Sequence, residues 1–266
     1  MIFAQHLLIF SVIYKNNAKI FFKTIFFKLK YKFSVYILKI TYDYLMCRLA
    51  FIDKKYISKE IIIKFLKQSI EVKNTPNHVS YLDADYHLDG YGIAWYLDKW
   101  YIYKSKEVFN KDNNLEVILD TILILKPTKI ILHIRNKGEL SVGNAHFNNC
   151  HPFVYNNYTF CHNGYIVDFI ENKEKILSLI KPEFIKEIKG ETDSEHLFYL
   201  ILSLQIFSEN EIKQILKLNN IRIIGNCIFS IDDTINVYRF FNIDNHIPSL
   251  YYYDDNKIIS SEPLII

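Results

Sequence analysis

The sequence predicts an α+β fold in which layered β-sheets are flanked by helices. Three observations lead to this prediction. Short runs rich in aromatic and β-branched residues, bounded by turn residues, are typical of strands. Other segments repeat apolar residues at helical spacing. Strands come first, then helices, then strands again, with short connections, so we expect the elements to pack as layers around one core.

The first half of residues 46–266 is expected to begin with a strand and an amphipathic helix. An aromatic-rich hairpin then turns at Asp98-Lys99. A second helix ends before Pro127 and leads into a buried strand. The expected bounds are 47–52 for the first strand, 58–73 for its helix, 91–105 for the hairpin, 113–125 for the second helix and 129–134 for the buried strand.

The second half is expected to contain a helical block between two groups of strands. A polar loop over 135–150 precedes a hairpin that turns at Asn156-Asn157. The last third of the chain is again predicted to form a strand, a turn and a strand. The expected bounds are 153–164 for the hairpin, about 168–180, 193–207 and 209–218 for the helices, and 221–241 and 251–261 for the closing strands.

Length and charge limit the classes of protein to which the chain can belong. Its 266 residues, half of them hydrophobic, can bury one substantial core, and the length demands no more than one domain with an appendage. The formal net charge is +3, of which residues 1–45 contribute +6 and residues 46–266 contribute −3. No basic run follows residue 46. Nucleic acid is therefore not an expected partner.

The four cysteines favour a reducing, cytoplasmic compartment. Their spacing is not that of a disulfide framework. A zinc site built from Cys150-His151, Cys161-His162, Cys227 and His146 is the alternative interpretation, but the spacing matches no closed zinc module. Core cysteines and no bound metal are therefore expected. We also expect His78 and His87 to be solvated loop residues, and Trp95 and Trp100 to pack in the core or hairpin.

Residues 1–45 are expected to lie upstream of the functional domain. Their opening apolar run is fourteen residues long, whereas a membrane-spanning helix needs roughly 20. The order of charge and apolar residues does not fit a secretory signal. Association with a membrane is not expected, and a basic amphipathic anchor is the alternative. We expect Met46 to be the true start, or residues 1–45 to be removed, with residues 46–266 as the domain.

Six short stretches in order along the chain combine reactive side chains with small residues. The closing Ser261–Leu264 (SEPL) adds a seventh feature. Together they make the chain resemble the class II glutamine amidotransferases of the N-terminal-nucleophile type, and in particular the stand-alone subfamily. The resemblance covers residues 46 to about 264. The six stretches are Met46–Leu49 (MCRL), Asp89–Tyr96 (DGYGIAWY), His133–Arg135 (HIR), Asn148–Phe153 (NNCHPF), His162–Gly164 (HNG) and Gly190–Glu195 (GETDSE).

The resemblance implies a four-layer αββα sandwich, in which two antiparallel sheets lie between helical layers, and a Cys47 nucleophile. In this family the free α-amine of the nucleophile is the base, so Cys47 must be the first residue. A model α-amine pKa of about 7.7–8.0 suits that role. Removal of Met46 would expose Cys47. Asn163 and Gly164 would then donate hydrogen bonds to the oxyanion.

Two charged residues suit the amino-acid end of glutamine. Arg135, at a strand end, can grip a carboxylate with two parallel hydrogen bonds. Asp193, at the start of a helix after Thr192, can accept hydrogen bonds from an ammonium group. The resemblance implies that these two residues bind the substrate. Asp89, Gly90 and Gly92 are expected to form a turn with close packing, and Ser194 and Glu195 to be first-turn helix residues.

The expected activity is hydrolysis of the γ-amide of glutamine or of a γ-glutamyl compound through a thioester on Cys47, with no cofactor. A partner enzyme that takes up ammonia in trans stays open. The alternative is a catalytically inactive protein of the same fold that binds glutamine or a partner.

Overall fold

The computed structural model describes residues 47–71, 87–136, 146–240 and 249–264. The expectations for residues 1–46, for His78, for the end of the first helix and for part of the polar loop lie outside the described residues. All described residues belong to one unit, Asp43–Ile266. Ten strands in this unit form two antiparallel sheets.

The six-stranded sheet brings the two ends of the described chain together. Its strand order is β3-β2-β4-β1-β10-β9. Strand β1 therefore lies inside the sheet, paired with β4 on one side and with β10, near the end of the chain, on the other. The strands are β1 (Arg48–Asp53), β2 (Tyr91–Tyr96), β3 (Trp100–Ser105), β4 (Lys129–Ile134), β9 (Tyr251–Tyr253) and β10 (Ile258–Ser260).

The four-stranded sheet has the order β5-β6-β7-β8. Its inner strands β6 and β7 pair over nine residues, from Tyr158↔Ile231 to Ile166↔Ile223. The strands are β5 (Phe153–Tyr155), β6 (Tyr158–Ile166), β7 (Ile223–Ile231) and β8 (Thr234–Phe240).

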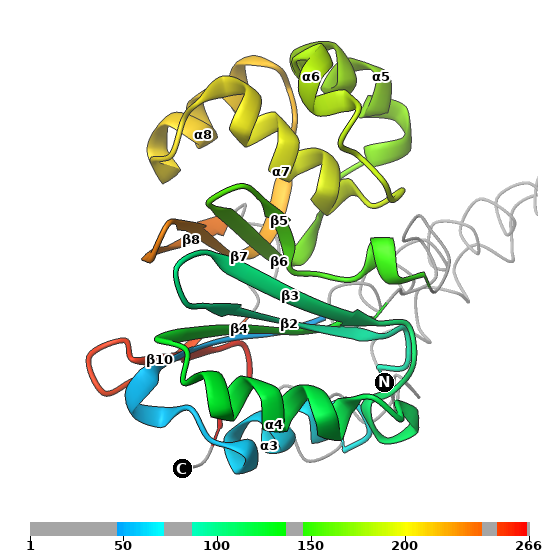
Figure 1. Cartoon of the computed structure of the whole chain (residues 1–266). Helices are drawn as coiled ribbons and strands as arrows, with labels where there is room; N and C mark the ends of the chain where they lie inside the picture. The colour runs from blue at the N-terminus through cyan, green and yellow to red at the C-terminus, as the bar shows by residue number, and fades with distance from the viewer. Residues whose placement is uncertain (1–46, 72–86, 137–145, 241–248, 265–266) are drawn as a thin grey trace, which may run out of the picture. The chain divides into compact units, whose positions relative to one another are not determined.

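Helices cover the outer face of each sheet, which gives the four-layer αββα sandwich that the family resemblance implied (Figure 1). Helices α3 and α4 pack on the six-stranded sheet, and α5, α6, α7 and α8 lie beyond the four-stranded sheet. The short helix α6 was not predicted, although Pro182 at its first position is a helix-start signal. The helices are α3 (Lys59–Lys67), α4 (Leu115–Leu125), α5 (Phe169–Leu179), α6 (Pro182–Ile185), α7 (Asp193–Leu204) and α8 (Glu209–Leu218).

The predicted elements appear with small shifts at their ends. Helix α3 is shorter than expected: it ends at Lys67 with Gln68 as its C-cap, although apolar residues at helical spacing continue to Ile70. Trp95 and Trp100 are buried, as predicted, and the Trp100 indole donates a hydrogen bond to the Asp232 carbonyl at 2.8 Å. Within the described residues, no helix is both long enough and apolar enough to cross a membrane.

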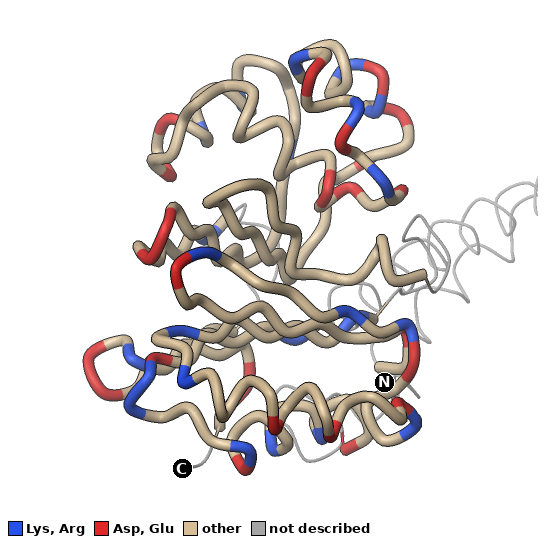
Figure 2. The backbone as a smooth tube through the Cα atoms, viewed as in Figure 1, with Lys and Arg blue, Asp and Glu red and all other residues tan. Residues whose placement is uncertain are grey.

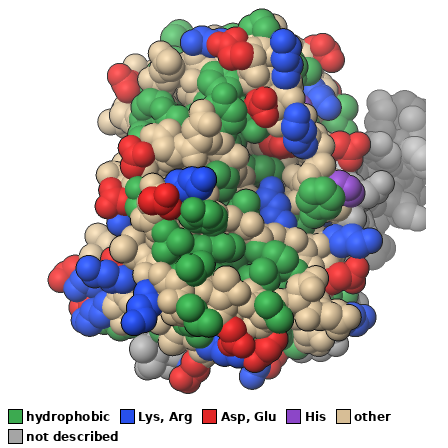
Figure 3. Space-filling model, viewed as in Figure 1, with side chains coloured by type: hydrophobic (Ala, Val, Ile, Leu, Met, Phe, Trp, Pro, Cys, Tyr) green, Lys and Arg blue, Asp and Glu red, His purple; other side chains and the backbone are tan. Residues whose placement is uncertain are grey.

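Charged residues concentrate on the outer helices and on loops, with both signs interspersed (Figure 2). The strands of the two sheets are mostly uncharged, so the few buried charges among them stand out. Apolar side chains gather near the middle of the face shown in Figure 3. Strand β3 is an edge strand of its sheet and exposes Ile102.

Buried histidines join the two sheets. His133 of β4 is fully buried, and its Nε2 lies 3.2 Å from the carbonyl oxygen of His162 in β6. A carbonyl can only accept, so Nε2 carries the proton in this contact. The His133 ring also packs on His151, with ring centroids 4.2 Å apart. His87 is buried as well, so the expectation of a solvated loop histidine was wrong.

Burial keeps these histidines neutral. It lowers the pKa of His133 to about 3 and that of His162 to about 4. The ordinary pKa of 6.5 applies after unfolding. Below that pH the unfolded chain binds more protons than the folded one, so folding stability must fall as the pH falls.

The free energy of unfolding is therefore expected to decrease between pH 6.5 and about pH 4.5. Each histidine contributes up to about 1.4 kcal/mol per pH unit. Replacing His133 by Gln should lower stability at neutral pH but make this slope shallower by about that amount. Urea unfolding at several pH values measures both slopes, with His162→Gln as a second variant. If the free energy of unfolding depended on pH as steeply in both variants as in the wild type, the low pKa values of these two histidines would be contradicted.

Candidate functional site

Cys47 lies directly before β1, and its side chain is half-buried. Its Sγ is 3.3 Å from the backbone nitrogen of Asn136, which donates to it, and 3.5 Å from the Asn136 carbonyl oxygen, which accepts from the thiol. Sequence reasoning missed Asn136, since a backbone contact leaves no signal in residue type. The sulfur is therefore held against the segment that follows β4.

Five influences act on the ionisation of the Cys47 thiol. Burial raises its pKa above the ordinary value. The Asn136 hydrogen bond and the Arg135 charge lower the pKa, while the carboxylates of Asp193 and Asp89 raise it. Since the net effect raises the pKa, the thiol needs a nearby base to become a nucleophile at neutral pH.

Arg135 follows β4 and faces the start of β1. The β1–β4 pairing joins Arg48 to Ile134, so one further step of the antiparallel register sets Cys47 opposite Arg135. Only 3% of Arg135 is exposed, and its backbone nitrogen donates to the Gly90 carbonyl at 2.8 Å. The structure thus brings the predicted nucleophile and the predicted carboxylate-binding residue together.

The turn before β2 requires glycine, as the sequence predicted. Gly90 has φ +104°, and a Cβ there would lie 2.4 Å from the Ser105 carbonyl oxygen. At Gly92 a Cβ would lie 2.0 Å from the carbonyl oxygen of His151. These two close approaches hold the segment after Asp89 beside Arg135.

Asn163 and Gly164 lie side by side in β6. A Cβ at Gly164 would lie 2.0 Å from the Ile224 carbonyl oxygen, so contact with β7 is itself a reason for glycine here. Asn163 is buried, and its Oδ1 has no hydrogen-bond partner among the residues that the structure describes. A buried acceptor left open in this way suits a ligand that donates a hydrogen bond. His133 of β4 bonds the carbonyl of His162, just before Asn163, and so ties this part of β6 to the sheet that contains β1.

Asp193 is the first residue of α7, and Thr192 caps the helix. The two oxygens of the Asp193 carboxylate accept from the backbone nitrogens of Ile166 at 2.6 Å and Ser194 at 2.8 Å. Burial raises its pKa, and these donors lower it. The carboxylate is half-buried. It is therefore oriented by the end of β6 and influences the Cys47 thiol.

Glu195 and Ser194 do more than occupy the first turn of a helix. Only 4% of Glu195 is exposed, and its carboxylate accepts from the backbone nitrogens of Lys189 at 3.0 Å and Gly190 at 2.6 Å. Ser194 Oγ lies 3.0 Å from Nδ1 of His162. These contacts fix the segment before Asp193 and tie α7 to β6.

The start of β1 contains a buried ion pair that sequence reasoning missed. Arg48 Nη2 lies 3.5 Å from Glu262 Oε1, and both side chains are buried. The available signal was a charged residue within an otherwise apolar strand, paired with an acidic residue in the closing SEPL segment.

Three of the cysteines are core residues. Cys150, Cys161 and Cys227 are buried, as predicted. Burial raises the pKa of each thiol, to about 11 in Cys150. Across the described ranges, no group of three or more histidines, cysteines and acidic residues is arranged to hold a metal ion.

Three comparisons place the chain among known proteins. The family model for class-II glutamine amidotransferases matches residues 75–238, more than half of the chain. This range contains Arg135, Asn163, Gly164 and Asp193 but begins after Cys47. The probable glutamine amidotransferase DUG3 of Saccharomyces cerevisiae is 33% identical over 121 residues, which are 43% of this chain and 32% of that relative. The chain therefore matches less than a third of that relative's length.

A solved structure supports the fold. The glutamine aminotransferase class-II domain protein from Silicibacter pomeroyi is similar with a TM-score of 0.52 and 23% identity, over 80% of this chain and 87% of that one. It shares the arrangement of two antiparallel sheets between helical layers. On the match of the family model, this chain belongs to the class-II glutamine amidotransferase family.

Proposed function

We propose that the domain of residues 46–266, after removal of Met46, is an enzyme that hydrolyses the γ-amide of glutamine or of a γ-glutamyl compound, with Cys47 as its first residue and nucleophile. The observation that carries the proposal is the position of the Cys47 thiol, opposite Arg135 and within the electrostatic reach of Asp193. In this arrangement the Cys47 thiol meets the γ-amide of glutamine, the Arg135 cation meets the α-carboxylate, and the Asp193 anion meets the α-ammonium. Cytoplasmic glutamine, or a γ-glutamyl peptide or thiol, is the proposed substrate.

The α-amine of Cys47 takes the thiol proton, and the sulfur attacks the γ-carbonyl carbon. Negative charge then develops on the former carbonyl oxygen, where Asn163 and the Gly164 N–H donate. The protonated amine gives its proton to the leaving nitrogen as the C–N bond breaks. Ammonia, or an amine, leaves a γ-glutamyl thioester on Cys47. The amine next activates a water molecule, and hydrolysis releases glutamate and restores the thiol.

The rest of the site selects the amino-acid end of the substrate. Arg135 binds the α-carboxylate with two parallel hydrogen bonds, and Asp193 binds the α-ammonium. The Asp193 carboxylate is held by the backbone of Ile166 and by Ser194, so it is preorganised before the substrate arrives.

The Cys47→Ser variant should lose at least about a thousandfold in glutamine hydrolysis, since a hydroxyl is a far weaker nucleophile beside an amine base. Release of ammonia and glutamate measures the loss. The matched control is Cys227→Ala, which removes a buried thiol that has no role in the reaction and should keep turnover within a few-fold of the wild type. Unchanged turnover in Cys47→Ser would refute the proposal.

Intact-mass measurement of the purified protein distinguishes the mature forms. A chain that begins at Cys47 and hydrolyses glutamine supports the enzyme. A chain that retains residues before Cys47, binds glutamine and does not hydrolyse it would instead support the inactive binding protein.

The Asp193→Asn variant should lose most of its preference for glutamine over glutaramate, which is glutamine without its α-amino group. The wild type should prefer glutamine by at least about tenfold in kcat/KM, because glutaramate would leave the half-buried Asp193 carboxylate without its ammonium partner. Steady-state kinetics on both amides provide the measurement. Arg135→Lys is the comparison, because it should raise KM for both amides alike. A wild-type preference kept in full by Asp193→Asn would contradict the assignment of the ammonium site.

A further inference from the structure

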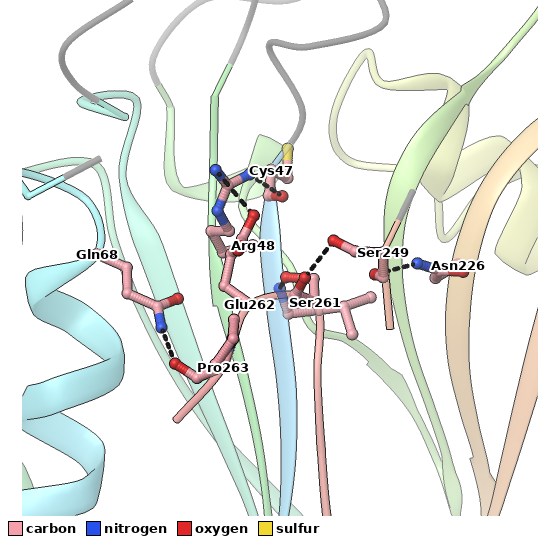
Figure 4. Close-up of polar contacts among 9 residues, drawn as sticks. Cys47, Arg48, Gln68, Asn226, Ser249, Ser261, Glu262 and Pro263 are labelled. Atoms are coloured by element: carbon pink, nitrogen blue, oxygen red, sulfur yellow. Dashed lines mark hydrogen bonds and ion pairs between the residues drawn. The ribbon is translucent and has the colours of Figure 1, made fainter. Parts of the chain in front are cut away.

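A buried side-chain clamp holds the main chain of the nucleophile. Arg48 Nη1 donates to the carbonyl oxygen of Cys47 at 3.3 Å, and Arg48 Nη2 lies 3.5 Å from Glu262 Oε1. We call these two side chains the Arg48–Glu262 clamp. Figure 4 shows the guanidinium group of Arg48 beside both the Glu262 carboxylate and the Cys47 carbonyl.

The segment that carries Glu262 is anchored on both sides. Ser261 exchanges two hydrogen bonds with Leu49, at 3.1 Å from the Leu49 nitrogen to Ser261 Oγ and 3.0 Å from the Ser261 nitrogen to the Leu49 carbonyl. Gln68 donates to the Pro263 carbonyl at 3.3 Å (Figure 4). Leu264 is buried. The carboxylate of Glu262 is therefore presented to Arg48 from a fixed piece of backbone.

The Arg48–Glu262 pair differs from the exposed ion pairs of the protein in its position beside Cys47 and in the free energy required to bury its two charges. Cys47 precedes the paired residues of β1, so strand pairing orients its main chain from one side only, through Arg48. The clamp supplies that orientation, while the Asn136 nitrogen fixes the sulfur. Removing two charges from water costs several kcal/mol per ion, so a buried pair is weak evidence for stability alone. Its place at the nucleophile points to a role in the reaction.

The clamp also places a positive charge beside the proposed base. The α-nitrogen of Cys47 is separated from the carbonyl oxygen that Arg48 contacts only by Cα and the carbonyl carbon. A cation this close disfavours a second positive charge on the amine, and the Glu262 carboxylate weakens that effect. The other charged groups around Cys47 are Arg135 after β4, Asp89 before β2 and Asp193 on α7.

Further titratable groups face the same residues. Cys150 and Cys161 lie within electrostatic reach of the Cys47 thiol, and burial raises the pKa of both. The imidazole of His87 lies within reach of Arg48, and burial lowers its pKa well below the ordinary value. All three are therefore neutral at neutral pH, so the clamp, Arg135 and the two aspartates set the charge around the nucleophile.

We propose that Arg48 and Glu262 are positioning residues for the N-terminal nucleophile: they fix the backbone of Cys47, and the Arg48 charge favours the unprotonated α-amine that acts as base. This inference rests on the proposed function. Arg48 acts through Cys47 and does not touch the substrate. Glu262 sets how much of the Arg48 charge the amine experiences.

Opposite shifts of the pH profile test the inference. The experiment uses protein expressed from the full sequence and purified in the form that begins at Cys47. Arg48→Gln should move the acid limb of kcat/KM upward by at least about 0.5 pH unit, and Glu262→Gln should move it downward. Both should lower kcat about tenfold or more while KM for glutamine stays within about threefold. Arg48→Lys keeps the charge, so it should keep the wild-type acid limb.

Matched controls come from exposed ion pairs. Arg222→Gln breaks the exposed pair with Asp168, and Glu116→Gln weakens the exposed pair with Lys59. Neither should move the acid limb, and thermal unfolding of every variant reports its stability. Acid limbs that coincide with the wild type in both clamp variants, or that move in the same direction, would overturn the inference.

A readout without turnover separates this inference from the proposed function. The rate of Cys47 alkylation by iodoacetamide, measured against pH, reports ionisation of the nucleophile in the absence of glutamine. Shifts of opposite sign in the two clamp variants would support the positioning role even if the wild type hydrolysed no glutamine. If the wild type hydrolyses glutamine and neither clamp variant shifts the pH profile of alkylation, the proposed enzyme stands and the clamp has no role in its mechanism.

Discussion

The pairing of β1 on both of its edges is the constraint on which the site depends. Strand β4 fixes one edge, and β10 fixes the other. A slip of one residue would exchange the two buried faces of β1: Leu49 and Phe51, which pack toward the four-stranded sheet, would change places with Ala50 and Ile52, which pack under α3 and α4. That register sets Cys47 opposite Arg135.

The two sheets are then held at the correct separation by polar contacts that depend on burial. His133 reaches from β4 to the carbonyl of His162, and His162 reaches on to Ser194 at the start of α7. This connects the strand beside the nucleophile with the strand of Asn163 and the helix of Asp193. Buried hydrogen bonds of this kind are costly to leave unmade, so they favour one arrangement of the four layers. These contacts also make the fold sensitive to acid, since each buried histidine must stay neutral.

The sequence predicted the layers and the placement of the main reactive groups. Periodicity located the strands and most helices, because buried faces impose spacings of two and of three to four residues. Arg135 at a strand end and Asp193 at a helix start both lie where they were expected. The helix α6 and the length of α3 were missed, since apolar spacing alone does not mark where a helix stops.

Long-range polar pairs were harder to predict. His87 was expected to be a solvated loop residue, whereas the fold buries it near Arg48. The contact of Asn136 with Cys47 is made by backbone atoms, and Glu262 meets Arg48 across more than two hundred residues of sequence. Only the pairing of distant strands brings such groups together, and residue types alone do not specify that pairing.

Mass spectrometry of the protein quenched with acid during glutamine turnover tests most directly whether Cys47 is the N-terminal nucleophile. A digest should contain an N-terminal peptide that begins at Cys47 and carries a γ-glutamyl group on its sulfur. An N-terminal peptide with residues ahead of Cys47 in a protein that hydrolyses glutamine, or a γ-glutamyl group on another side chain, would contradict that assignment.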